Sequence, residues 1–212
     1  MSFEEYRRTE FEGVAEWVDG RVEVDMSVGK PHFLVVDFLR DLIKWFLLVE
    51  PSGQLLAEPY GMRAVEEGNQ RLPDLFYLTH EHLDRFGDDE LEGPADLCIE
   101  VVSPGSVQRD YRTKLLEYQA NGVREYWIID PTTTPERAEF YVLALDPVHR
   151  GQLTFRPVPI GDDGTYHSTV LEGFWMRVGW LWDDQAVVQQ CLAEVVGVER
   201  MVAALRTKAT AE

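Results

Sequence analysis

Cysteines, long apolar runs and basic residues are all scarce in this chain. Cys98 and Cys191 are the only cysteines in 212 residues, and no CxxC spacing occurs, so neither a zinc site nor a disulfide framework is indicated. We expect both to be reduced thiols in the core. Apolar runs such as Trp45 to Val49 are far shorter than the roughly 20 residues that span a bilayer, and the beginning of the chain is too acidic for a secretory signal. These absences predict a cytoplasmic protein with no membrane partner.

The charge of the chain is strongly negative, since 20 basic residues face 38 acidic ones and the formal net charge is −18. Such a protein repels nucleic acid unless basic residues gather locally or a metal ion intervenes. A hydrophobic content of 45%, with 11% aromatic residues, excludes a disordered chain. We expect one domain over residues 1–182, followed by a C-terminal helix over residues 183–212 that packs on the domain or extends from it.

Local patterns in the first third of the chain predict both helices and strands. A capping-box spacing starts a helix that runs from Ser2 through about Phe11. The dipeptide Asp19-Gly20 suits the turn of a hairpin in AEWVDGRVEV, and a long helix opens at Pro31. Further on, the acidic segment GDDELEGP is typical of a surface loop.

The most informative pattern begins with an apolar strand over residues 95–102. A helix from about Asp110 to Asn121 follows, with Gly122 as its stop, and then the apolar strand EYWIID. This order of strand, helix and strand predicts a βαβ unit with parallel pairing and a right-handed crossover. The segments from RAEFYVLALD onward predict antiparallel edge strands, and a C-terminal amphipathic helix is expected from Asp183. The expected fold is α/β with a mixed sheet.

Glu100 lies in the middle of the first apolar strand. Because side chains alternate along a strand, Glu100 shares one face with Cys98 and Val102, whereas Leu97 and Ile99 lie on the other. Two largely apolar faces are typical of a central strand covered by helices. An ionised carboxylate in that position costs several kcal/mol without a partner. Glu100 therefore needs a cation, which is a lysine, an arginine or a metal ion.

The helix after this strand offers one such cation. Tyr111, Leu115 and Tyr118 have the spacing of an inward-facing stripe, and Lys114 lies on its flank. The ammonium of Lys114 is therefore expected to reach toward Glu100, whereas Glu117 is expected to point to water.

A second acid is found in RLPDLFYL, where Pro73 is expected to begin a strand that carries Asp74 on the same face as Phe76. Two carboxylates on adjoining strands repel each other, and bound Mg²⁺ or Mn²⁺ is a common way to keep such a pair ionised. The backbone carbonyl of Val101, beside Glu100, offers a further oxygen ligand.

Each of these residues also has a purely structural interpretation. Glu100 and Lys114 can form a simple buried ion pair. Glu16, which flanks the expected hairpin, can be a solvent-exposed acid, and His32, directly after Pro31, can be a surface or capping residue. The residues alone leave both interpretations open.

Several of these segments together resemble a known family. RLPDLFYL, followed by ADLCIEVVSPGSVQRDYRTKLLEYQANGVREYWIIDP, is similar to the Uma-type putative restriction endonuclease family, a group within the PD-(D/E)xK nuclease superfamily. The resemblance extends over most of residues 5–182, from EWVDGRVEV to LEGFWMRVGWLW. It implies a restriction-endonuclease-like mixed β-sheet core that is flanked by helices and has antiparallel edge strands.

The resemblance also implies roles for individual residues. Asp74 matches the aspartate of the PD half-motif and Glu100 the acid of the (D/E)xK half, which makes both metal ligands. Val102 occupies the usual lysine position, and Lys114 takes that role from the following helix. Glu16 matches an early acid that adds a ligand or orients a metal-bound water. His32 and Tyr118 match recurrent positions of the family whose roles the sequence does not assign.

The expected function is therefore that of a metal-dependent endonuclease that hydrolyses DNA phosphodiester bonds. The expected cofactor is Mg²⁺, with Mn²⁺ as a substitute, and a homodimer is favoured. Lys114 would position or deprotonate the attacking water, since a desolvated lysine beside a metal ion can have a depressed pKa. The alternative is a non-catalytic binding or scaffold protein that keeps the nuclease fold and self-associates. A glycosidase with paired acids is a third reading, but no sugar-binding platform is found.

Overall fold

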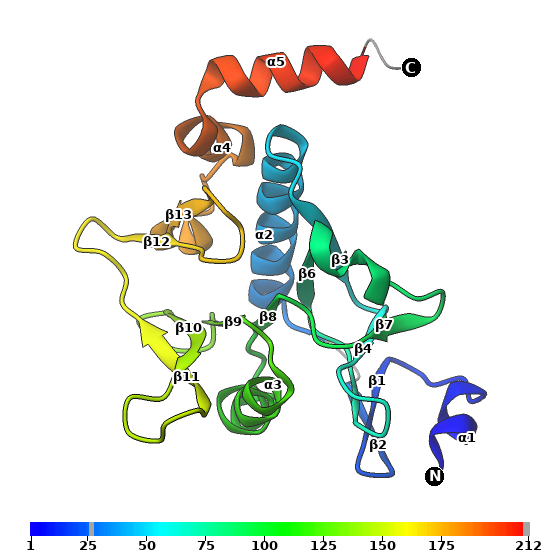
Figure 1. The fold of residues 1–212 in the computed structure, drawn as a ribbon. Coiled ribbons are helices and arrows are strands. Elements are labelled where there is room, and N and C mark those ends of the chain that lie inside the picture. Colours follow the sequence, from blue (N-terminus) through cyan, green and yellow to red (C-terminus); the bar gives the residue numbers. More distant parts are fainter. Residues whose placement is uncertain (26–27, 210–212) are drawn as a thin grey trace.

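A six-stranded sheet forms the centre of the computed structural model, which describes residues 1–25 and 28–209 (Figure 1). Its strands are β3 Gly53–Ala57, β6 Leu75–Thr79, β8 Leu97–Val101, β9 Glu125–Asp130, β10 Arg137–Leu145 and β11 Leu153–Val158. They lie in the order β11-β10-β9-β8-β6-β3. Strands β8 and β9 are parallel, whereas all the other neighbours in this sheet are antiparallel. The mixed sheet with antiparallel edges predicted from the sequence is confirmed.

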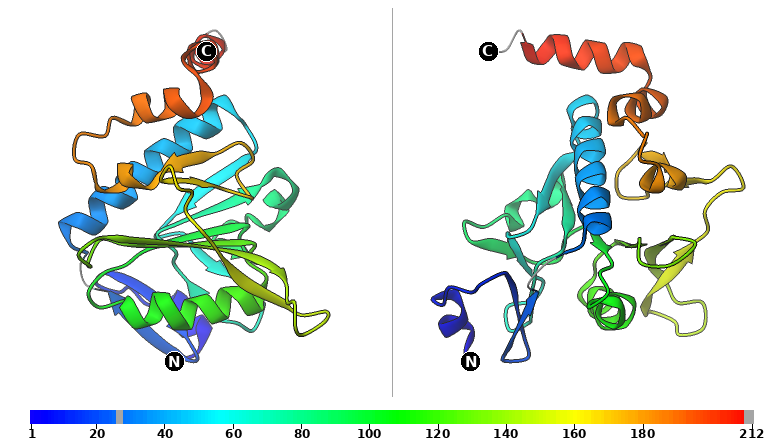
Figure 2. Two further views of the ribbon diagram at one scale, coloured as in Figure 1. Left: turned by 90° about the vertical axis from the view of Figure 1, so that its left-hand side faces the viewer. Right: turned by 180° about the vertical axis from the view of Figure 1, so that it is seen from behind.

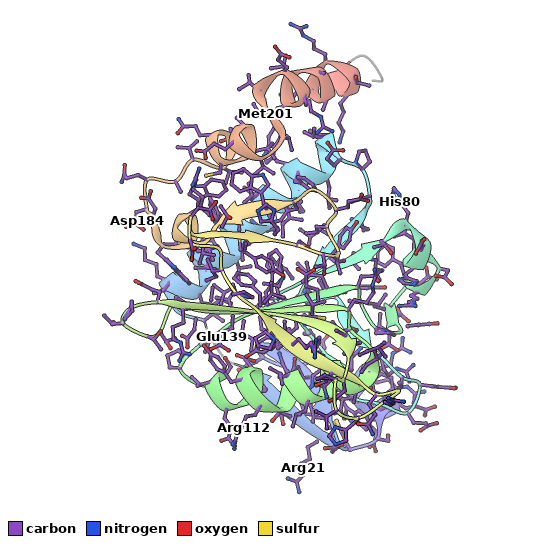
Figure 3. The ribbon with its side chains drawn as sticks, turned by 60° about the vertical axis from the view of Figure 1, so that its left-hand side comes forward. Arg21, His80, Arg112, Glu139, Asp184 and Met201 are labelled. Atoms are coloured by element: carbon purple, nitrogen blue, oxygen red, sulfur yellow. The ribbon has the colours of Figure 1, made fainter. Side chains whose placement is uncertain are left out.

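Helices cover both faces of this sheet. Helix α2, Lys30–Val49, lies across one face, while the π-helical turn η2, Arg109–Lys114, and the continuing helix α3, Leu115–Asn121, lie across the other (Figure 2). Arg112 points away from the sheet on the outer side of this helical segment (Figure 3). Helix α2 confirms the long helix predicted from Pro31.

The alternation predicted along β8 decides which side chains meet which helix. Leu97 and Ile99 belong to the apolar cluster that includes α2, whereas Cys98 and Val102 belong to the cluster that includes α3. All five residues of β8 are buried. Glu100 therefore projects from a central strand into the interior between the sheet and the helical segment η2–α3.

The βαβ unit is also confirmed. Gly122 ends α3 with a left-handed backbone, φ 85°, which a residue without Cβ adopts at little cost. The chain then enters β9, which pairs in parallel with β8. This short crossover fixes the position of the helical residues relative to the end of β8.

A second sheet packs beside the first and carries the N-terminal hairpin. Its strands are β1 Val14–Val18, β2 Arg21–Asp25, β4 Gly61–Arg63, β5 Gln70–Arg71 and β7 Glu90–Glu92, in the order β2-β1-β5-β4-β7. Asp19 and Gly20 both have positive φ, 47° and 75°, as the expected hairpin turn requires. The surface loop expected for GDDELEGP is wrong, because Glu90 is buried in β7 and bonded to Arg63 and Gln70.

The N-terminal helix is shorter than predicted. The capping box between Ser2 and Glu5 is present, but α1 covers only Phe3–Arg7. The chain then folds back, so that the Phe11 ring stacks on Tyr6 with 5.4 Å between ring centroids.

The C-terminal region also differs from the single helix expected from Asp183. Asp183 follows the 3₁₀ helix η3, Val178–Trp182, and helix α4 begins only at Val188. Helix α4, Val188–Val196, packs against α2 through its buried residues, and Gly197 separates it from α5, Val198–Ala209. Figure 1 shows α5 at the far end of the molecule from α1. Two short strands, β12 Thr165–His167 and β13 Trp175–Arg177, precede these helices.

Three remaining features bear on the sequence predictions. Cys98 and Cys191 are free and buried, as expected. The 3₁₀ helix η1, His80–Arg85, follows β6. Within residues 1–25 and 28–209, no helix combines the length and apolarity needed to cross a membrane.

Candidate active site

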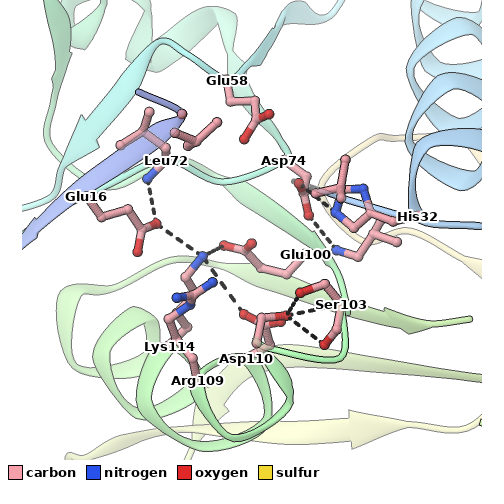
Figure 4. A pocket seen from close by; sticks show the side chains of 15 residues that line it. Glu16, His32, Glu58, Leu72, Asp74, Glu100, Ser103, Arg109, Asp110 and Lys114 are labelled. Atoms are coloured by element: carbon pink, nitrogen blue, oxygen red, sulfur yellow. Dashed lines mark hydrogen bonds and ion pairs between the residues drawn. The ribbon is translucent and has the colours of Figure 1, made fainter. Parts of the chain in front are cut away.

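A cavity of about 210 Å³ opens between the N-terminal hairpin, the first turn of α2, the end of β8 and the turn η2 (Figure 4). Five carboxylates line it, and these belong to Glu16, Glu58, Asp74, Glu100 and Asp110. Val101, Arg109, Lys114 and His32 line it as well. The cavity therefore contains every residue that the sequence proposed as a catalytic group or metal ligand, and it carries more acid than base.

Asp74 lies at the point where the chain passes from the second sheet into the first. The strand expected to begin at Pro73 begins instead at Leu75. Asp74 therefore precedes β6 and takes no part in its strand pairing. Pro73 lacks an N–H and suits such a junction. The Asp74 Oδ2 atom accepts a hydrogen bond of 2.7 Å from the backbone N–H of Val101. This bond ties the carboxylate to the end of β8, next to Glu100.

His32 holds the other oxygen of the same carboxylate. Its Nε2 atom lies 3.1 Å from Asp74 Oδ1, and the ring is buried in the first turn of α2. Burial acts to lower the pKa of His32, but the hydrogen bond and charge of Asp74 outweigh burial and raise it. The expectation of a surface or capping histidine is wrong, because this side chain orients Asp74.

Glu100 is held by two donors on the helical segment. The Tyr118 hydroxyl donates to Glu100 Oε1 over 2.7 Å, and the Lys114 ammonium lies 2.9 Å from the same oxygen. Burial raises the pKa of Glu100; Lys114 opposes this shift, and the Asp110 and Asp74 carboxylates reinforce it. Tyr118 thus acquires a role that the sequence did not assign, as the orienting partner of Glu100.

Three acids lie close to the ammonium of Lys114. Besides Glu100, its Nζ atom lies 3.2 Å from Glu16 Oε1 and 3.9 Å from Asp110 Oδ1, and the residue is 3% exposed. Burial acts to lower the pKa of Lys114, but the three carboxylates outweigh burial and raise it above its usual range. In this arrangement each nearby acid favours the charged amine. The charged amine is suited to positioning water and offsetting negative charge.

Glu16 is fixed from three sides and is no solvent-exposed acid. From β1 its Oε1 atom accepts a 2.9 Å bond from the N–H of Leu72, and its Oε2 atom lies 3.0 Å from Arg71. Burial acts to raise the pKa of Glu16, but Lys114 and Arg71 outweigh burial and lower it to about 2. Arg71 is itself buried and bonded to Glu117, which therefore does not point to water as expected.

Three site residues were missed by sequence reasoning. Asp110 lies four residues before Lys114, which is a spacing that predicts a shared helical face, so a signal existed. Glu58 belongs to the connection between β3 and β4; burial and the Asp74 carboxylate raise its pKa. Arg71 sits in a two-residue strand with no pattern of its own. Only the tertiary fold brings Glu58 to the cavity and Arg71 into contact with Glu16.

The carboxylates of the cavity are oxygen donors of the kind that a hard divalent cation prefers. Among the described residues, no three acid, histidine or cysteine side chains are already gathered in ligand geometry. Mg²⁺, however, is usually bound through one or two carboxylates and several waters. Asp74 and Glu100 line one cavity, and the buried Oδ1 atom of Asp110 has no hydrogen-bond partner within the described part of the chain. The residues present therefore fit one hydrated cation and do not form a closed protein cage.

The comparisons with known proteins identify a family and a similar fold. The family described as "Uma2: Putative restriction endonuclease" matches residues 3–179. The fold is similar to the crystal structure of a putative nuclease belonging to DUF820 from Anabaena variabilis ATCC 29413, with a TM-score of 0.60 and 16% identity. That match covers 81% of this chain and 90% of the other. No curated protein matches the chain. Because the family match spans most of the sequence, the chain belongs to the Uma2 family of restriction-endonuclease-like proteins.

Proposed function

We propose that this protein is a metal-dependent endonuclease that hydrolyses phosphodiester bonds in DNA, with Mg²⁺ as its cofactor and Mn²⁺ as a substitute. The observation that carries the proposal is the convergence of Asp74, Glu100 and Lys114 on one cavity with an excess of acid. The description of the family as restriction endonucleases favours DNA as the substrate.

The balance of charge in the cavity favours a cation site over a simple ion pair. A structural ion pair contains equal numbers of acids and bases, but here five carboxylates line the cavity beside the three basic side chains of Lys114, Arg109 and His32. An acidic cavity in a protein of net charge −18 repels a phosphate group unless a cation binds with it. A divalent ion would reconcile the negative cavity with a negative substrate.

Each residue has a defined task in this proposal. Asp74 and Glu100 would hold the ion together with the Val101 carbonyl, and their orienting partners His32 and Tyr118 fix the two carboxylates. When bound, the ion would supply Lewis acidity toward the phosphate and would lower the pKa of water.

The two remaining groups act beside the ion. Lys114 would orient the attacking water and offset negative charge that grows on the phosphate oxygens. Glu16, immobilised by Arg71 and Leu72, would hold the ammonium of Lys114 in place or add an oxygen ligand. The cavity walls thus supply positioning and charge, which are the main contributions of a protein to phosphoryl transfer.

Nicking of a supercoiled plasmid tests the proposal. The wild-type protein should nick the plasmid in Mg²⁺ or Mn²⁺ and not in EDTA, whereas Asp74→Asn and Glu100→Gln should lose the activity by at least about a hundredfold. Glu81→Gln is the matched control, because Glu81 is an exposed acid on η1 outside the cavity. Plasmid, single-stranded DNA and nicked duplex that all stay intact in both metals would contradict the proposal and favour a non-catalytic nuclease-fold protein.

A further inference from the structure

Asp110 is a buried acid whose placement the proposed function does not explain. It is 2% exposed, lines the cavity from the turn η2, and its Oδ1 atom makes no hydrogen bond to any described residue. A buried carboxylate oxygen without a donor is unfavourable and rarely kept in a protein interior. The ammonium of Lys114 lies 3.9 Å from this atom.

The π-helical turn brings this acid into line with the other helical groups of the site. An α-helix advances about 100° per residue, so four residues overshoot one full turn by about 40° and eight residues by about 80°. The residues of η2 form the wider π turn, which offsets that overshoot. Asp110 and Lys114 therefore both line the cavity, and Tyr118, four residues further on, donates its hydrogen bond to Glu100.

The proposed cation and Lys114 compete for the same carboxylate. Lys114 Nζ is 2.9 Å from Glu100 Oε1, although Glu100 must also serve the cation. Two positive groups in contact with one carboxylate repel each other strongly in a buried site. A shift of the ammonium away from Glu100 would relieve this repulsion when the ion binds, and another acid would have to receive the ammonium.

We propose that Asp110 is a positioning residue that takes over the ammonium of Lys114 when Glu100 engages the divalent cation. This inference rests on the proposed function. Glu16 stays in contact with the ammonium, because Arg71 and the Leu72 N–H hold Glu16 fixed. A movement of about 1 Å would shorten the 3.9 Å separation from Asp110 Oδ1 to that of a charged hydrogen bond, about 2.8 Å. The ammonium would then lie beside the ion and not on its ligand.

A double-mutant cycle on Mn²⁺ affinity, measured by calorimetry, tests the proposal. Asp110→Asn should weaken Mn²⁺ binding by about 10- to 100-fold in the wild-type background, as is usual for partners of metal ligands. In the Lys114→Met background the same substitution should cost no more than about threefold, because no ammonium has to be relocated. An equal loss in both backgrounds would identify Asp110 as a direct metal ligand. It would overturn the proposed transfer of the Lys114 ammonium from Glu100 to Asp110.

Other outcomes are also decisive. Unchanged Mn²⁺ affinity in Asp110→Asn would overturn the proposed transfer of the ammonium but not the proposed function. A wild-type protein that binds no Mn²⁺ would overturn both proposals. Melting curves of the four metal-free proteins show whether each variant is folded. A crystal structure of the wild-type protein with Mn²⁺ gives a test that needs no variant, since Lys114 Nζ should lie within about 3 Å of Asp110 Oδ1 and should have left Glu100. An ammonium that stays on Glu100 in the metal complex would refute the inference.

Discussion

Replacing Lys114 by methionine removes the single ammonium that faces three buried carboxylates. The side chains of Lys114 and Glu100 are each 4% exposed and lie 2.9 Å apart. Breaking a buried ion pair by removing one partner typically costs about 3–5 kcal/mol, because the other charge stays buried. At roughly 2–4 °C per kcal/mol for a protein of this size, the melting temperature should fall by about 6–20 °C.

The opposite substitution, Glu100→Gln, should cost far less. The amide oxygen of glutamine still accepts the hydrogen bond from Tyr118, and Lys114 keeps the carboxylates of Glu16 and Asp110. The substitution also removes one negative charge from an acid-rich cavity. We therefore expect a change within about 1 kcal/mol in the absence of metal, which is the net value of one ordinary hydrogen bond.

Urea unfolding in EDTA at pH 7.5, followed by tryptophan fluorescence, measures this asymmetry. The chain has six tryptophans, and Trp127 is fully buried in the core, so unfolding should give a clear signal. Lys44→Met is the matched control, because Lys44 is exposed on α2 and its loss should change the unfolding free energy by about 0.5 kcal/mol or less. If Glu100→Gln destabilises the protein as much as Lys114→Met does, the two residues form a balanced structural pair and the reasoning fails.

Three further predictions concern other buried groups. Burial acts to raise the pKa of Asp96, but hydrogen bonds from Thr79, His82 and Arg124 lower it. Asp96→Asn should therefore cost about 1–3 kcal/mol at pH 7 by urea titration. The cost should be much smaller at a pH below the lowered pKa, because the stabilisation by this carboxylate is lost as the pH falls from its unfolded to its folded pKa. Glu125 is fully buried and accepts hydrogen bonds from the loop at residues 168–170, so Glu125→Gln should lower the unfolding free energy by about 3 kcal/mol or more. Tyr118→Phe should weaken calorimetric Mn²⁺ binding by about tenfold or more, and an unchanged affinity would show that the hydroxyl does not orient Glu100.

Periodicity in the sequence located the parts of the site that belong to regular elements. The alternation along residues 95–102 placed Glu100 on a buried face, and the helical spacing brought Lys114 to the same side. Both inferences are local, because a strand and the helix that follows it are joined by a short connection whose geometry is restricted. The strand pattern of RLPDLFYL singled out Asp74 as a second acid, and the family resemblance then added Glu16.

The remaining parts of the site depend on contacts between distant segments. Arg71 joins Glu16 to Glu117, two residues about a hundred positions apart in the sequence, and nothing in its own two-residue strand predicts this. Glu117 was predicted to contact water because it lies outside the apolar stripe. Its side chain instead binds the buried Arg71. The π turn was also unpredicted, and it brings Asp110 and Tyr118 closer to one line along the helical segment.

The most direct test of the metal site is an anomalous difference map from crystals of the wild-type protein soaked in Mn²⁺. The account predicts one strong peak in the cavity, at about 2.1 Å from carboxylate oxygens of both Asp74 and Glu100. A map without a peak in this cavity, or with Mn²⁺ only at acids elsewhere on the surface, would contradict it.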